Sequence, residues 1–182
     1  METIIYIILT IILLVIFIIL AKYNQLITLL NRVKKSSSNI EIYLKKRFDL
    51  IPNFVECVKG YSNYEKETLE SIISLRNNYE SQQKLDIKEA TKMNNQLNKY
   101  LAIVENYPEL KANEQYLDLQ KKLGSIEDEL VHTRHTYNED VTKYNTLIEK
   151  VPSNIVASMF AFKKAELFQI DDETKENVKI DL

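Results

Sequence analysis

Residues that form turns are scarce in this sequence, which contains two glycines and three prolines among 182 residues. Strand-like alternation of apolar and polar residues between turn signals is not found either. A sheet needs frequent turns, whereas a few long helices need almost none. We therefore predict an all-α protein.

Residues that commonly carry catalysis are also few. Cys57 is the only cysteine and can form no intramolecular disulfide, which agrees with a reducing compartment. No histidine lies near it in the sequence, and its simplest role is that of a small buried hydrophobe. The two isolated glycines exclude a glycine-rich phosphate loop. We therefore predict neither an enzyme nor a cofactor.

An excess of charge of one sign is missing too. The chain carries 24 basic and 26 acidic residues, mixed along its length, and its formal net charge is -2. Nucleic acid is not a predicted partner, because binding to phosphate backbones requires clustered basic residues. Short charged tracts such as 121–122 and 127–129 are interpreted as solvated helix faces.

One long uncharged run is present, from Ile4 to Ala21, and only Tyr6 and Thr10 interrupt it. As a helix it covers roughly 27 Å, close to the ~30 Å hydrocarbon core of a bilayer. Lys22 and Tyr23 follow, as expected at the level of the lipid headgroups. The run therefore predicts a single membrane-spanning helix, with the lipid bilayer as a partner. Positions that represent this span are Ile4, Leu9, Leu14 and Ile19.

The charges around the span predict whether it is cleaved and how it is oriented in the membrane. A cleaved signal peptide would show a basic stretch, a shorter apolar run and then small residues, but the only charge before this run is Glu2. We therefore expect an uncleaved anchor in the cell membrane. The nearby basic residues follow the span, which predicts a cytoplasmic body with the N-terminus outside. They are Lys22, Arg32, Lys34 and Lys35.

The apolar residues after the anchor keep helical spacing. One stripe, with Ser37 in its gap, predicts a helix that continues from the anchor to Asp49. The stripe consists of Leu26, Leu30, Val33, Ile40, Leu44 and Phe48. Because proline disfavours the α conformation in the residue before it, we expect a hairpin at Pro52 and a second helix over Pro52–Tyr79. The stripe keeps its phase across Pro52, so a kinked continuous helix is the alternative.

Two further helices complete the pattern. A weaker one is predicted from about Asp86 to Asn106, and the clearest one over 116–151, where apolar residues alternate steps of three and four. This seam contains Tyr116, Leu119, Leu123, Ile126, Leu130, Tyr137, Val141, Tyr144, Ile148 and Val151. Each helix has only one apolar stripe and cannot be stable alone in water. The predicted fold is therefore an N-terminal transmembrane helix followed by an antiparallel four-helix bundle.

A short apolar segment after Pro152 has two interpretations. If successive helices alternate in direction, the last one returns toward the bilayer, and this segment reaches the membrane surface beside Lys163 and Lys164. The side chains that would contact the membrane are those of Phe160, Phe162, Leu167 and Phe168. The alternative is that they cover the end of the bundle core, and it is favoured because it buries the same area without lipid. The acidic tail, residues 169–182, is predicted to be disordered.

Several motifs together resemble the signature of the LemA family. They are Asn31-Arg32-Val33, residues 44–56 (LKKRFDLIPNFVE), residues 58–61 (VKGY), residues 107–112 (YPELKA), the pairs Tyr137-Asn138 and Tyr144-Asn145, and residues 151–157 (VPSNIVA). The resemblance extends over residues 22–168, and the N-terminal anchor before them also agrees with the family. It implies a single-pass bacterial membrane protein with an antiparallel four-helix cytoplasmic domain, in a family whose biochemical role is not established. We divide the chain into an anchor (1–21), a LemA-like bundle domain (22–168) and a tail (169–182).

Three departures from the family pattern argue against a shared surface site. Ser37 stands where the family usually has a tryptophan, and Tyr64 where a histidine is common. Ala161 replaces a glycine before Phe162.

Glu65 and Arg76 are the charged residues on or beside the inward face predicted for 52–79. Their functional interpretation is a binding site. Their structural interpretation, a buried ion pair with neighbours on another helix, is favoured. Such a pair would specify helix register more than it would add stability.

The strongest candidate for a metal site is Glu129 with His132 and His135, because helical bundles hold two metals with carboxylates and Glu/His pairs from facing helices. The second copy of this motif is missing, since the sequence has no other histidine. No metal is predicted. The preferred function is a membrane-tethered interaction or scaffold protein that binds protein partners or further copies of itself. The alternative is a helical bundle with a metal or small-molecule site.

Overall fold

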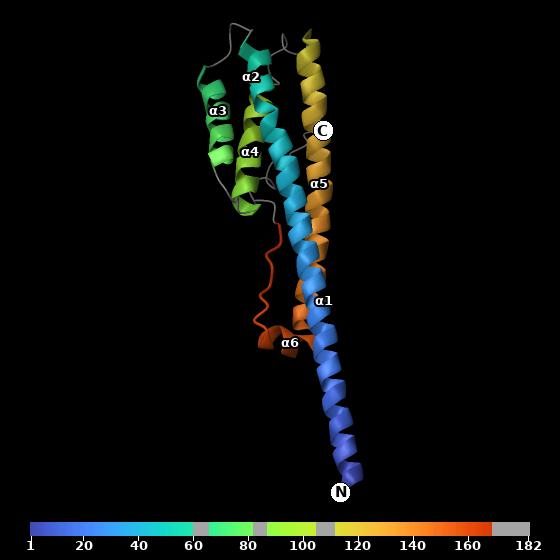
Figure 1. The fold of residues 1–182 in the computed structure, drawn as a ribbon. Coiled ribbons are helices and arrows are strands. Elements are labelled where there is room, and N and C mark those ends of the chain that lie inside the picture. The colour runs from blue at the N-terminus through green and yellow to red at the C-terminus, as the bar shows by residue number, and fades with distance from the viewer. Residues whose placement is uncertain (60–65, 82–86, 105–111, 169–182) are drawn as a thin grey trace, which may run out of the picture. The chain divides into compact units, whose positions relative to one another are not determined.

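The computed structural model describes residues 1–59, 66–81, 87–104 and 112–168 of the chain. These residues form six helices and no strand, which confirms the predicted all-α fold (Figure 1). The helices are α1 (Glu2–Asp49), α2 (Ile51–Lys59), α3 (Lys66–Ser81), α4 (Ile87–Val104), α5 (Glu114–Glu149) and α6 (Ser153–Met159). The chain divides into two compact units, the first made of Met1–Ser36 with Thr136–Leu182 and the second of Ser37–His135.

The beginning of α1 is the segment predicted to span the membrane. Among the described residues, it belongs to the one helix that is long and apolar enough to cross a bilayer. The side chains of Ile4, Leu9 and Leu14 are exposed, and that of Ile19 is half-buried. Uncovered apolar side chains over such a length suit lipid rather than water.

The helix continues past Pro52, and the hairpin predicted at this residue is wrong. Only Leu50 separates α1 from α2, and the Phe54 N–H donates to the Leu50 carbonyl at 3.1 Å. Pro52 lies in the first turn of α2, where its missing N–H removes no helical hydrogen bond. The alternative to the hairpin, a helix that carries on past Pro52, is therefore correct, with an interruption at Leu50.

The single helix predicted over Pro52–Tyr79 is wrong as well. Helices α2 and α3 pack against each other and run in opposite directions, so they are two helices and not one (Figure 1). Periodicity does not reveal this reversal, because the apolar faces of both helices are buried in the same core. Buried residues of that core on α2 and α3 are Ile51, Phe54, Val55, Val58, Leu69, Ile72 and Leu75.

The second unit is the four-helix bundle. The end of α1 with α2 forms its first member, and α3, α4 and the first part of α5 follow in alternating directions (Figure 1). Helices α4 and α5 confirm the helices predicted over 86–106 and 116–151 within the described residues. Asn113 caps α5, since its side-chain oxygen accepts hydrogen bonds from the N–H groups of Gln115 and Tyr116.

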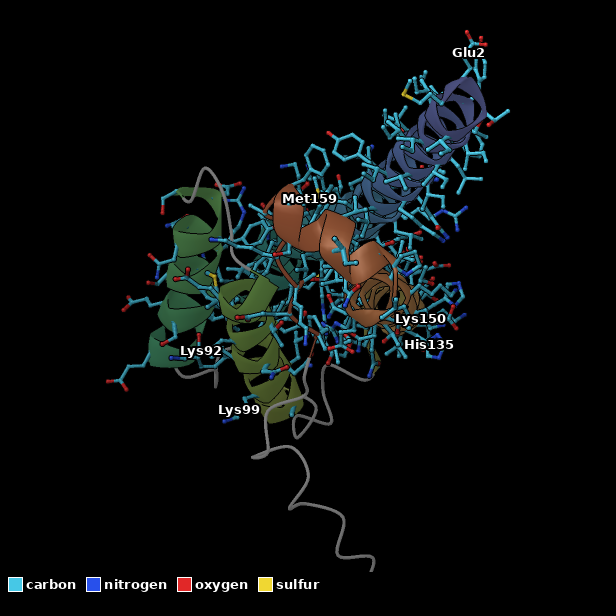
Figure 2. The ribbon with its side chains drawn as sticks, turned by 90° about the horizontal axis from the view of Figure 1, so that it is seen from below. Glu2, Lys92, Lys99, His135, Lys150 and Met159 are labelled. Carbon is cyan, nitrogen blue, oxygen red and sulfur yellow. The ribbon has the colours of Figure 1, made fainter. Side chains whose placement is uncertain are left out.

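The first unit combines part of α1 with the end of α5, with α6 and with residues 161–168. Helix α6 turns away from the axis of α5 between Lys150 and Met159 (Figure 2). Buried residues of this unit include Leu26, Val33, Tyr137, Val141, Tyr144, Val156 and Ala157.

Two details of the predicted stripes are wrong. Ser36, not Ser37, fills the gap in the α1 stripe, because it is the buried residue and its hydroxyl donates to the Asp140 carboxylate of α5. Val151 is 77% exposed although it was assigned to the seam of α5. The helix ends at Glu149, so helical spacing no longer positions Val151.

Candidate functional site

Three aromatic rings meet where the apolar run of α1 ends. The centroid of the Tyr23 ring lies 4.7 Å from that of Phe160 and 5.8 Å from that of Phe162. Tyr23 follows Lys22 directly after the uncharged run. Aromatic residues favour this level of a bilayer, where one side of the ring is apolar and the other wet. We call these three residues the border cluster.

Exposed apolar side chains continue from the border cluster onto α6. Ile155 and Met159 lie one helical turn apart and therefore share a face, and both are exposed. Val151 before the helix is exposed as well, and Phe160 after it is 50% exposed. Figure 2 shows Met159 at the end of α6. This apolar surface has the composition of a segment that lies in a membrane interface.

The turn after α6 brings both phenylalanines to Tyr23. The Phe162 N–H donates to the Ala157 carbonyl at 2.9 Å, and the Ala161 N–H donates to the Ser158 carbonyl at 3.2 Å. These two bonds form a Schellman motif, which requires a left-handed residue. Ala161 adopts that conformation, with a φ of 53°. A glycine at this position, as in the family pattern, would adopt it without strain.

Residues 163–168 follow this turn and are bound to α5; we call them the strap. The Asn145 Nδ2 donates to the Ala165 carbonyl at 2.8 Å, and its Oδ1 accepts from the Ala165 N–H at 2.9 Å. Asn138 forms the same two bonds with Phe168, at 3.0 and 2.7 Å. Each asparagine thus pairs with the strap as a neighbouring strand would.

The tyrosine beside each asparagine binds the strap too. The Tyr144 hydroxyl donates to the Lys163 carbonyl and the Tyr137 hydroxyl to the Glu166 carbonyl, each at 3.0 Å. Burial raises the pKa of Tyr144. The spacing explains the repeat, since seven helical residues rise roughly 10.5 Å and three extended residues cover roughly 10 Å. A Tyr-Asn pair repeated after seven positions of α5 therefore meets backbone groups repeated after three positions of the strap.

The strap leads away from the border cluster, because its later residues bind earlier turns of α5. Phe168 is 8% exposed and belongs to the core, while Leu167 is exposed. The structure therefore brings Phe160 and Phe162, two of the four predicted membrane contacts, to the end of the apolar run. It places the other two further along α5.

In the second unit, the site of interest is Arg47, which is 3% exposed. Its Nη1 donates to the Asn94 Oδ1 at 2.6 Å and to the Glu127 carboxylate, and its Nη2 donates to the Asn98 Oδ1. Arg134 Nη1 lies 3.4 Å from the same carboxylate. One buried guanidinium thus joins α1, α4 and α5.

This arginine network contains two guanidinium groups and one carboxylate. Burial lowers the pKa of Arg47 and the pKa of Arg134, and the Glu127 carboxylate opposes the effect at both. Arginine nevertheless stays protonated in proteins. The two guanidinium groups thus share the Glu127 carboxylate.

A cavity of about 300 Å³ lies beside the network. Arg47, Asn98 and Glu127 form its polar end. The rest of the lining is Phe54, Leu101, Ala102, Tyr116, Gln120, Leu123 and Gly124, from α2, α4 and α5. Such a volume is at the lower limit of small-molecule sites, which combine apolar walls with a few polar groups.

The charged residues singled out in the sequence were different ones. Glu65 lies outside the described residues, and Arg76 pairs with Glu80 of its own helix, Nη2 to Oε1, at 2.6 Å. Arg47 went unnoticed although it lies in a LemA-like motif. It follows Leu44 by three positions, so helical spacing alone places it on the buried face.

The described residues contain no group of three histidine, cysteine or acidic side chains that could hold a metal ion. Glu129, considered with His132 and His135, is hydrogen-bonded to Tyr43, and this contact raises the pKa of the tyrosine. Cys57 is a half-buried free thiol.

Three features together define the class of single-pass, membrane-anchored helical proteins. They are an exposed apolar helix, an aromatic cluster where its apolar run ends, and a helical bundle. The sequence profile of the LemA family matches residues 36–182. Since this is most of the chain, the protein belongs to the LemA family, as its motifs predict. It is accordingly a membrane-associated helical protein.

Similar proteins come from two kinds of bacteria. Protein LemA of Metamycoplasma hominis is 28% identical over 170 residues, which cover 88% of this chain and 77% of that protein. Magnetosome protein MamQ of Magnetospirillum gryphiswaldense is 25% identical over 178 residues, or 82% and 65% of the two chains. Magnetosome protein MamQ 2 of Paramagnetospirillum magneticum is 25% identical over 187 residues, or 83% and 66%. None of these names denotes an enzyme.

Proposed function

We propose that this protein is a membrane-tethered scaffold. The beginning of α1 crosses the cell membrane, and the bundle binds a protein partner or a second copy of the chain on the cytoplasmic side. The observation that carries this proposal is the border cluster, in which Phe160 and Phe162 contact Tyr23 directly after the apolar run. Tyr23 belongs to α1, and the two phenylalanines follow α6. Both segments of the first unit would therefore contact the bilayer at the same level.

The tether is stiff. Helix α1 is continuous from Glu2 to Asp49, so no flexible linker follows the membrane span. The strap and α6 add a second attachment to the same border. A first unit attached at two points is held close to the lipid, which is what a tether requires.

Two further features favour the proposed arrangement. Basic residues follow the span, at Lys22, Arg32, Lys34 and Lys35, which favours a cytoplasmic body. Exposed ion pairs one turn apart, such as Lys45 with Asp49 and Lys122 with Asp118, keep the surface of the bundle soluble and open to a partner.

Depth-dependent fluorescence tests whether the border cluster contacts the membrane. The sequence has no tryptophan, so a single introduced one is an unambiguous probe. We expect Phe160→Trp in the full chain, reconstituted in phospholipid vesicles, to emit at shorter wavelength than in water. Brominated lipids should quench it strongly.

Leu167→Trp is the matched control, because Leu167 is also exposed and lies further along the strap. Its emission should be quenched several-fold less. Equal quenching at both positions, or no quenching at Phe160→Trp, would show that the border cluster does not touch lipid and would overturn the proposed membrane contact.

Orientation is tested by thiol labelling. In a Cys57→Ser background, Ser125→Cys places a thiol on the exposed face of α5. A membrane-impermeant maleimide should label it only after cells are permeabilised. Labelling of intact cells would contradict the cytoplasmic placement.

The scaffold is distinguished from a metalloprotein in one preparation of the full chain in nanodiscs. We expect no stoichiometric metal, together with either self-association or binding to a partner captured in native membranes. One metal per chain, lost in His132→Ala, would favour the alternative function instead.

A further inference from the structure

A stretch without charge surrounds α6. Residues 151–162 contain no charged side chain, and lysines lie on both sides of them, with Lys150 before and Lys163 and Lys164 after. The membrane-spanning run of α1 ends in the same way, since Lys22 follows Ala21. Lysines at the ends of apolar segments are typical of chains in contact with a membrane, because the ammonium group reaches the lipid headgroups.

Helix α6 has apolar side chains on two sides. Val156 and Ala157 are buried and fix the helix within the first unit. Val151, Ile155 and Met159 are exposed. Exposed apolar side chains that lie together, rather than singly, mark a site of interaction. The packing of the first unit therefore accounts for one side of α6 and leaves the other side for a partner.

The direction of α6 suits a bilayer surface. The helix runs across the direction of α5 and of the beginning of α1 in both views (Figure 1, Figure 2). A helix that runs across a membrane span lies along the plane of the membrane, as interfacial helices do. Its end is fixed beside the span, because Phe160 contacts Tyr23. The uncovered side of α6 thus continues the surface that the span presents to lipid.

The charge beside this surface is positive. Lys164 pairs with Glu149. In the part of the chain that the structure describes, no carboxylate pairs with Lys22, Lys150 or Lys163. Lys150 and Lys163 are exposed, and Lys22 is half-buried. Basic residues at a membrane surface attract anionic lipids, and the attraction falls off within a Debye length of ~8 Å at physiological salt.

We propose that α6 lies in the headgroup layer and binds anionic phospholipids there. The side chains of Ile155 and Met159 enter the upper acyl region, and the ammonium groups of Lys22, Lys150 and Lys163 contact the phosphate groups of the headgroups. This inference rests on the proposed membrane tether and adds the class of lipid that the tether prefers. Phosphatidylglycerol, which carries one negative charge, is the probe, and phosphatidylcholine is its neutral counterpart.

The lipid around α6 is identified by fluorescence quenching. Ile155→Trp in the full chain is an unambiguous probe, since the sequence has no tryptophan. The chain is reconstituted in vesicles that contain equal amounts of phosphatidylglycerol and phosphatidylcholine, and only one of the two lipids is brominated in each preparation. We expect brominated phosphatidylglycerol to quench about threefold more strongly than brominated phosphatidylcholine.

The lysines are tested together in the same chain. Lys22→Gln, Lys150→Gln and Lys163→Gln should remove the preference, so that both brominated lipids quench equally. Quenching itself should persist, because the apolar side of α6 is unchanged. Raising the salt concentration should weaken the preference of the parent protein in the same direction, since salt screens charges at the membrane surface.

The matched control carries Arg32→Gln, Lys34→Gln and Lys35→Gln. It removes the same amount of positive charge from exposed positions of α1. Arg32 lies roughly 15 Å further along the helix than Lys22, which is about two Debye lengths. This control should keep the preference of the parent protein. Circular dichroism of both triple variants verifies that each one is folded.

Two results would overturn the inference. Equal quenching by both brominated lipids in the parent protein, or a preference that survives without the three lysines, would show that these lysines do not bind anionic headgroups. Absence of quenching at Ile155→Trp would show that α6 faces water or a protein partner. Phe160→Trp reports on the tether separately. Strong quenching at that position, together with either result, would mean that the tether stands and this inference fails.

Discussion

The side-chain amide of Asn145 pairs in both directions with the backbone of Ala165, donating to its carbonyl at 2.8 Å and accepting from its N–H at 2.9 Å. A helix therefore binds an extended segment by imitating a strand. This contact and its repeat at Asn138 and Phe168 hold the strap along α5. They also determine where the border cluster lies, because the strap begins directly after Phe162.

Asn145→Ala should release the strap. The change removes two partly buried hydrogen bonds, and we expect a loss of about 2 kcal/mol in the free energy of unfolding. Amide hydrogen exchange at Ala165 should accelerate strongly. Asn145→Asp is the informative intermediate, since a carboxylate still accepts from the Ala165 N–H but cannot donate. Unchanged exchange at Ala165 in Asn145→Ala would show that the asparagine does not hold the strap.

Ala161→Gly should stabilise the protein by about 1 kcal/mol. Ala161 has a φ of 53°, a region that costs an L-residue with a Cβ about 1–2 kcal/mol and costs glycine almost nothing. Part of this gain is lost to the greater freedom of glycine in the unfolded chain. Thermal unfolding measures the difference. A lower midpoint for the glycine variant would mean that the Schellman motif is not the dominant local constraint.

Arg47→Met should destabilise the second unit by about 3 kcal/mol, because it leaves Glu127, Asn94 and Asn98 without their shared donor. Arg47→Lys should not restore stability fully, since one ammonium cannot reproduce the spread of guanidinium donors. Lys45→Met is the surface control. Its partner Asp49 lies at 3.7 Å in an exposed pair, so the change should cost less than about 1 kcal/mol. Chemical denaturation measures both changes in the free energy of unfolding. Equal losses in Arg47→Met and Lys45→Met would show that the arginine network does not stabilise the second unit.

Stability should fall at high pH through Tyr79. Burial, with Glu41 and Asp49 nearby, raises its pKa from 10.0 to about 12. The folded state therefore holds the phenol proton more tightly than the unfolded state. The resulting stability is fully present below pH 10 and is lost as the pH rises from 10 to about 12.

Tyr79→Phe isolates this contribution. The phenylalanine ring can keep the stacking on Phe48, where the ring centroids lie 4.2 Å apart, and it has no proton to lose. The difference in unfolding free energy between the two proteins should shrink over that pH range, as followed by denaturant titration. A constant difference would show that Tyr79 titrates normally in the folded protein.

Much of the fold could be predicted because the information is local. The uncharged run from Ile4 to Ala21 indicates an apolar helix by length alone, and the steps of three and four in 116–151 indicate α5 with most of its buried face. The same reasoning placed Val151 in the seam incorrectly. Periodicity describes a face and does not locate the residue where the helix ends.

The sites were harder to predict because they join residues that lie far apart in the sequence. Arg47 reaches Glu127 across 80 positions and Asn94 across 47, and nothing in the local pattern of either helix indicates the partner. The hairpin predicted at Pro52 is wrong for a related reason. Proline is compatible with the first turn of a helix as well as with a hairpin, and only the packing of α2 on α3 decides between them.

The sequence by itself therefore determined the class of protein: a helical chain with one apolar span and LemA motifs, since composition, periodicity and short motifs are properties of neighbouring residues. The tertiary structure alone decided that Phe160 and Phe162 meet Tyr23, that the Tyr-Asn pairs bind the strap, and that Arg47 is buried beside a cavity. These contacts depend on how the helices pack, and packing is set by the sum of many distant side-chain interactions rather than by any local signal.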